Sequence, residues 1–69
     1  MTAVALGVVA ERRQLLRITE DLVREFHPTR SAGAVIRTVV QCRDELVRCG
    51  VRAGLSVAAE EMARRRLSG

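Results

Sequence analysis

The stretch from Val35 to Cys49, which reads VIRTVVQCRDELVRC, decides the fold class of this chain. Its apolar residues recur at alternating steps of four and three, which is the spacing of one face of an α-helix. That face consists of Val35, Val39, Cys42, Leu46 and Cys49. The stripe is widened by Ile36, Val40 and Val47. The pattern predicts a helix over residues 32–49 whose apolar surface is wide enough to contact two neighbours.

Upstream of this stretch, apolar residues at steps of three and four predict another amphipathic helix over residues 8–26. We expect Leu22 and Phe26 to contribute to its buried face. The helix should end before Pro28, because proline disfavours the helical conformation in the residue that precedes it. Thr29 and Ser31 follow, and both are residue types that cap the start of the next helix.

Downstream, Gly50 supplies a stop for the central helix, and a third helix is predicted over residues 56–67 with Ser56 as its cap. Its expected buried stripe consists of Leu55, Ala58, Ala59, Met62, Ala63 and Leu67. Its surface should carry ion pairs one helical turn apart, Glu60 with Arg64 and Glu61 with Arg65. No segment alternates as a strand does, so the fold class is all-α, a three-helix bundle formed by a single domain over residues 1–69.

The chain is small enough that association is expected. Its 69 residues and 7.6 kDa bury only about 60% of the unfolded surface, which leaves little net stability. Two cysteines and one histidine supply neither a four-ligand zinc site nor a disulfide framework, and we expect no cofactor or metal. We therefore predict a homodimer or a complex with a partner protein, with no small-molecule substrate.

The first ten residues carry no charge. They are too few to cross a bilayer as a helix, and they lack the basic start and cleavage site of a secretory signal. We therefore expect no membrane association and a cytoplasmic protein with reduced cysteines. Residues 1–7 either extend the first helix, which we favour, or form a loose extension.

Cys42 and Arg48 match the Cys-x5-Arg spacing of cysteine phosphatases. That chemistry needs a loop whose N–H groups surround a phosphate, whereas this match contains no glycine and lies within a predicted helix. We therefore predict no catalytic residues and regard the cysteines as buried and reduced. The alternative is a disulfide between two copies of the chain, because Cys42 and Cys49 are about 10 Å apart on one helix, too far apart for an internal bond. His27, next to Pro28, is expected to have only a structural role in the turn.

The net charge of +4 and the isoelectric point near 11.0 raise the question of nucleic-acid binding. The run Arg64, Arg65 and Arg66 could contact phosphate groups, but we do not favour this interpretation. The first half of the same helix carries Glu60 and Glu61 where a recognition helix contacts bases, and no Trp or Tyr is present to stack on single strands.

The order of these features resembles small bacterial three-helix bundle dimerisation domains. These domains occur alone or at the N-terminus of protein-tyrosine-phosphatase-like and arsenate-reductase-like proteins. The resemblance covers residues 15–68 and rests on the helix Ile18-x3-Leu22-x3-Phe26, the central stripe, the turn 50–52 and the closing segment 57–67. The chain departs from that pattern at residues 54–56, where the family commonly has larger apolar residues and a proline. We expect no catalytic domain after Gly69, so the resemblance implies no phosphatase or reductase activity for this chain.

The resemblance implies a non-enzymatic module for helical self-association or protein docking, and this is the function that we predict. The alternative is an antitoxin-like regulator that binds a partner toxin and uses the basic run at residues 64–66 on DNA. A gel shift that is insensitive to salt and to loss of these arginines would count against the alternative.

Overall fold

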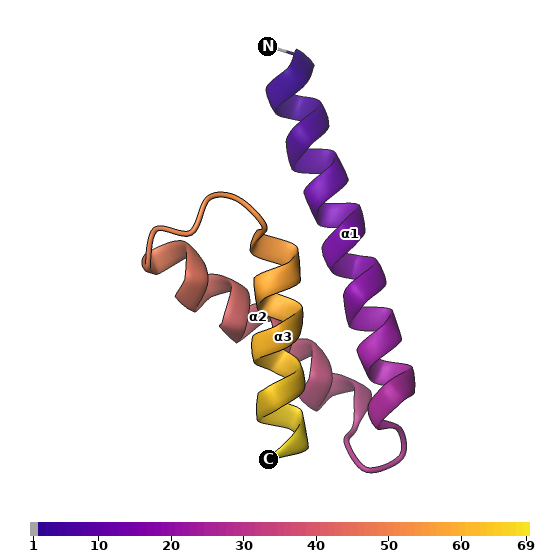
Figure 1. Cartoon of the computed structure of the whole chain (residues 1–69). Helices are drawn as coiled ribbons and strands as arrows, with labels where there is room; N and C mark the ends of the chain where they lie inside the picture. Colours follow the sequence, from indigo (N-terminus) through magenta and orange to yellow (C-terminus); the bar gives the residue numbers. More distant parts are fainter. Residues whose placement is uncertain (1) are drawn as a thin grey trace.

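The computed structural model describes the backbone of residues 2–69 and the side chains of residues 10–69. Three helices follow one another: α1 (Thr2–Phe26), α2 (Ala32–Arg48) and α3 (Leu55–Ser68). Within residues 2–69 no strand is present, and each helix packs against the other two. The all-α three-helix bundle predicted from the sequence is confirmed (Figure 1).

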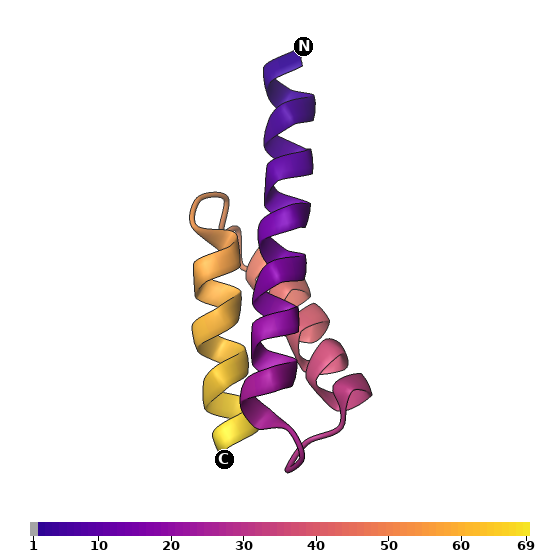
Figure 2. The same ribbon diagram turned by 90° about the vertical axis from the view of Figure 1, so that its right-hand side faces the viewer.

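The bundle is elongated, 42 × 22 × 15 Å, because α1 is longer than its neighbours and projects past the start of α3 (Figure 1). When α1 faces the viewer, α3 lies to its left and α2 begins to its right (Figure 2). The helix α1 begins at Thr2, ahead of the predicted Val8, so the backbone is helical where the sequence left an extension or a loose end open. The side chains of residues 1–9 lie outside the described part of the chain.

Local signals end α1 and delimit α2. The first helix stops at Phe26, two residues before Pro28. Ser31 caps α2, since its hydroxyl accepts a hydrogen bond from the N–H of Ala34 at 3.2 Å. At the other end, Gly50 takes a φ of 88°, a left-handed conformation that side chains disfavour. Its N–H donates to the carbonyl of Val47, and the next N–H, that of Val51, donates to the carbonyl of Leu46. This pair of bonds is the Schellman arrangement that closes a helix.

The start of α3 differs from the prediction. The helix begins at Leu55, after Gly54 with a φ of 65°, and no side chain caps it. Because the left-handed Gly54 reverses the chain one residue earlier than expected, Ser56 falls inside the first turn and is buried there. Ser56 is therefore not the cap.

The core forms where α2 meets both neighbours. Its buried residues come from all three helices: Ile18 and Leu22 from α1, Val35, Val39 and Cys42 from α2, and Ala59, Ala63 and Leu67 from α3. Phe26, Leu46 and Met62 are half-buried against this cluster. Cys49 lies outside it and is exposed, as the C-cap residue that follows the last residue of α2, Arg48.

Two apolar stripes run along α2, and only one of them is used within the bundle. The inner stripe consists of Val35, Val39, Cys42 and Leu46. The outer stripe consists of Ile36, Val40 and Val47, each one residue further along the helix and so turned by about 100°. All three residues of the outer stripe are about half exposed. The neighbours of α2 therefore cover the inner stripe and leave the outer one open.

We expect Val39→Ala to lower the free energy of unfolding by about 2 kcal/mol, through loss of two buried methyl groups and the cavity that remains. Val39 is 1% exposed, whereas Val57 on α3 is 53% exposed and provides the matched control. Val57→Ala should change the free energy of unfolding by less than about 0.5 kcal/mol. Urea denaturation at a fixed protein concentration measures both, and equal losses would contradict this assignment of the core.

Candidate functional site

An uncovered apolar surface lies on α1 and α2, on the side away from α3. We call it the outer face, and it consists of the outer stripe together with Leu16 and Val23 of α1. The exposed fraction runs from 48% for Ile36 to 61% for Leu16, and Val23 is half-buried. Side chains of this size are usually buried, so their concentration on one side of a small bundle marks a contact surface.

The outer face contains a groove of about 460 Å³ where α1 and the start of α2 lie together. Its lining residues are Leu16, Thr19, Glu20, Val23, Arg24, Ala32 and Ile36. No residue of α3 lines it. Beyond the groove α2 diverges from α1 (Figure 1), and Val40 and Val47 lie further along α2, outside the groove lining. The outer face therefore combines this groove with the exposed Val40 and Val47 of α2, which we call the ridge.

On the other side of the bundle, two arginines attach α3 to its neighbours. Arg64 donates two hydrogen bonds to the carboxylate of Glu25 on α1, both at 3.0 Å. Arg66 donates two to the carboxylate of Glu45 on α2, at 2.6 and 2.9 Å. Such paired bonds fix orientation as well as distance. They set the position of α3 against both other helices.

These bonds change the titration of the groups that make them. The hydrogen bonds from Arg64 hold the pKa of Glu25 below its ordinary value of 4.5, and those from Arg66 do the same for the pKa of Glu45. In turn, each carboxylate raises the pKa of its arginine. Both effects have the same cause, namely that the charged forms are bonded to each other.

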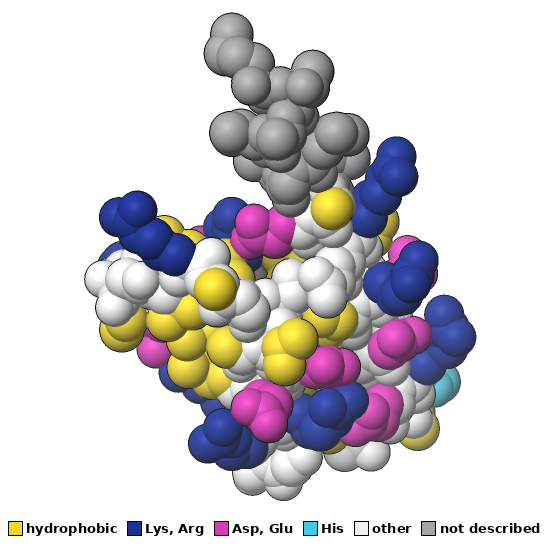
Figure 3. Space-filling view, turned by 45° about the horizontal axis from the view of Figure 1, so that its top comes forward, with side chains coloured by type: hydrophobic (Ala, Val, Ile, Leu, Met, Phe, Trp, Pro, Cys, Tyr) yellow, Lys and Arg dark blue, Asp and Glu magenta, His cyan; other side chains and the backbone are white. Residues whose placement is uncertain are grey.

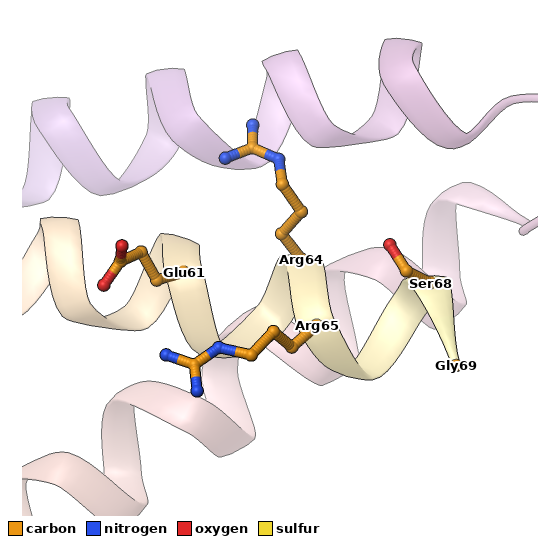
Figure 4. Close-up of a pocket in the computed structure, with 5 residues that line it drawn as sticks. All are labelled: Glu61, Arg64, Arg65, Ser68 and Gly69. Carbon is orange, nitrogen blue, oxygen red and sulfur yellow. The ribbon is translucent and has the colours of Figure 1, made fainter.

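The three arginines considered for nucleic-acid contact do not form one patch. Arg64 lines a surface hollow at the end of α3 and extends toward α1 (Figure 4), while Arg66 is held by Glu45 on α2. Arg65 lines that hollow, which measures about 440 Å³ and also contains Glu61. In Figure 3, arginines and acidic residues lie next to one another over the lower part of the molecule, without a continuous basic area. This distribution does not favour phosphate binding along the run.

The cysteines lie in different environments. Cys42 is fully buried in the core, and this burial raises the pKa of its thiol and so suppresses the reactive thiolate. The Cys-x5-Arg match lies within the continuous helix α2, where the backbone N–H groups bond along the helix axis instead of surrounding an anion. Cys49 is exposed and reduced.

Over the part of the chain with described side chains, no group of three or more His, Cys, Asp or Glu residues is arranged to hold a metal ion. None of the described helices, α1 included, combines the length and the apolar character that a bilayer crossing requires.

Sequence reasoning missed the partners of Arg64 and Arg66. It predicted pairs within α3, and Glu60 does lie 3.5 Å from Arg64. The bidentate partners are 39 and 21 residues away in the chain, and no local pattern indicates them. The exposure of Leu16 was not predicted either. Leu16 directly follows Leu15, which packs against the core, and the apolar pattern of this helix was interpreted only as a core-facing stripe.

Comparison with known proteins adds nothing to this geometry: no family model, no curated protein and no solved structure matches the chain. The function must therefore be argued from the described surfaces. Of these, the outer face carries four of the five exposed large hydrophobic residues among the described side chains, and Arg64 and Arg66 of α3 are bonded within the bundle.

We expect the bundle to lose stability at acidic pH through Glu25 and Glu45. Because both pKa values are lower in the folded chain, the stabilisation is complete above 4.5 and is lost as the pH falls through the folded values. Urea denaturation at several pH values below 5 measures this slope. The double variant Glu25→Gln, Glu45→Gln should be less stable at pH 7 and should show a shallower slope, whereas an unchanged slope would contradict the role of these pairs.

We expect one of the two thiols to react with a water-soluble disulfide reagent in the folded protein. Cys49 is exposed, whereas Cys42 is buried and its pKa is raised, so Cys49 should account for the fast reaction. Cys49→Ser should abolish the fast reaction, and Cys42→Ala should leave it intact. A fast reaction in the Cys49→Ser variant would contradict the core position of Cys42.

Proposed function

We propose that this chain is a non-enzymatic self-association module that forms a homodimer through the outer face. The observation that carries the proposal is the outer face itself, where apolar side chains of two helices stay about half exposed beside a groove. Water contact with these side chains is unfavourable, and covering them with a second apolar surface removes it.

The exposed area of the chain supports this reading. Its accessible surface is 5149 Å². A compact monomer of 7.6 kDa exposes about 4,300 Å², so this chain exposes about 850 Å² more. A stable protein interface covers about 800 Å² on each partner. The projecting α1 contributes to this excess, which is comparable in size with the surface that one partner buries in a stable interface.

The energetics of a small bundle favour the same proposal. A domain of this length has only a few kcal/mol of net stability, and oligomerisation is one of the few ways to raise it. Small domains are also commonly stabilised by a bound metal or by disulfides. The described part of the chain has no metal cluster, and its two cysteines are unpaired, so neither stabilises it there. Binding between folded copies adds stability by mass action.

The test is the molar mass in solution, measured by light scattering after size exclusion over a dilution series in reducing buffer. We expect a mass of about 15 kDa, twice that of the 7.6 kDa chain, at micromolar concentrations. The Cys49→Ser variant serves as the control, because it excludes a disulfide as the cause of dimerisation. A mass of one chain throughout the series would overturn the proposal.

A further inference from the structure

The outer face has a property that bears on how two copies meet. A dimer with two-fold symmetry uses the same patch on both copies, so the patch must complement itself. The outer face meets this requirement because it places a groove, lined by Leu16, Val23 and Ile36, beside a ridge that carries Val40 and Val47. A half-turn brings the ridge of each copy over the groove of the other.

We infer that two copies pair with their α2 helices antiparallel, so that Val47 of each enters the groove of the other and Arg37 of each faces Asp44 of the other. The inference rests on the proposed self-association and adds to it the surface, the direction of packing and the residues that set it.

The spacing along α2 supports the antiparallel direction. Ile36, Val40, Arg43 and Val47 lie on one line of the helix, at steps of four, three and four. Because this series is the same in both directions, an antiparallel partner places Val47 against Ile36, and Arg43 against Val40. The aliphatic part of Arg43 covers the valine while its charged end stays in water. A parallel partner would instead set Arg43 directly against Arg43.

The charges beside this line indicate the same direction. Arg37 is exposed, and no described acidic side chain lies within 4.0 Å of it. Asp44 is half-exposed, and its contact is with the adjacent Arg43, at 3.7 Å. In the antiparallel pair Arg37 and Asp44 of opposite copies come within about 3 Å of each other along the helix axis, which an arginine side chain spans. In a parallel pair the two-fold axis places this flank of α2 on opposite sides of the contact in the two copies, so Arg37 and Asp44 would have no partner across it.

Charge reversal tests the inference. Arg37→Asp and Asp44→Arg should each weaken the dimer by about tenfold or more, since two attractive pairs become repulsive. The double variant Arg37→Asp, Asp44→Arg restores both pairs and should return the dissociation constant to within about threefold of the parent. The control is Arg65→Asp, which makes the same change of charge on α3, far from the outer face, and should leave the constant nearly unchanged.

A second pair of variants tests the surface independently of the charges. Ile36→Glu should weaken the dimer by about a hundredfold or more, since it places carboxylates in the apolar contact. Val57→Glu makes a comparable change at an equally exposed valine on α3 and should have little effect. Circular dichroism of each variant checks that the helices remain, and sedimentation equilibrium gives the dissociation constants.

The outcomes separate the two proposals. A parent chain that is monomeric throughout the dilution series overturns self-association and this inference together. A dimer that is unaffected by either single charge reversal overturns the antiparallel arrangement, since in a parallel pair Arg37 and Asp44 of the two copies lie on opposite sides of the contact and do not meet. A dimer that dissociates with Val57→Glu but not with Ile36→Glu overturns the outer face as the interface and leaves self-association standing.

Discussion

The burial of Val35, Val39 and Cys42 against both α1 and α3 is the interaction on which the rest of the structure depends. In so short a chain one central helix must supply the core for both of its neighbours, and these three residues lie where the neighbours meet. Ala59 and Ala63 help because their small side chains let α3 approach closely. Once this stripe is covered, the orientation of every other side chain on α2 follows from the helical rotation of about 100° per residue.

That rotation explains why an apolar surface remains uncovered. Two helices cover a limited arc of a third, and the apolar arc of α2 is wider than that. Ile36, Val40 and Val47 fall in the remainder, where Leu16 and Val23 of α1 continue the surface. None of the three described helices covers it. In the proposed dimer, a second copy of the same chain would cover this surface.

Some charged residues form ion pairs within the bundle, and others lie beside the exposed outer stripe. Arg64 and Arg66 hold α3 against Glu25 and Glu45, so the most basic run of the sequence acts largely within the bundle. Because these pairs are on the surface, their effect on stability is smaller than that of the core, and their value lies in orientation. Arg37 and Asp44 lie beside the outer stripe instead, where they are available to a partner. A high isoelectric point therefore does not by itself indicate nucleic-acid binding.

The sequence by itself determined the number of helices, their approximate ends and the identity of the core stripe. These features depend on local chemistry: the restriction before Pro28, the hydroxyl of Ser31, the left-handed Gly50 and apolar spacing within one helix. Only the tertiary structure decided which stripe of α2 stays open and which carboxylates bind Arg64 and Arg66. Those outcomes depend on contacts between residues as many as 39 positions apart, and spacing within a single helix carries no information about which neighbour covers which side.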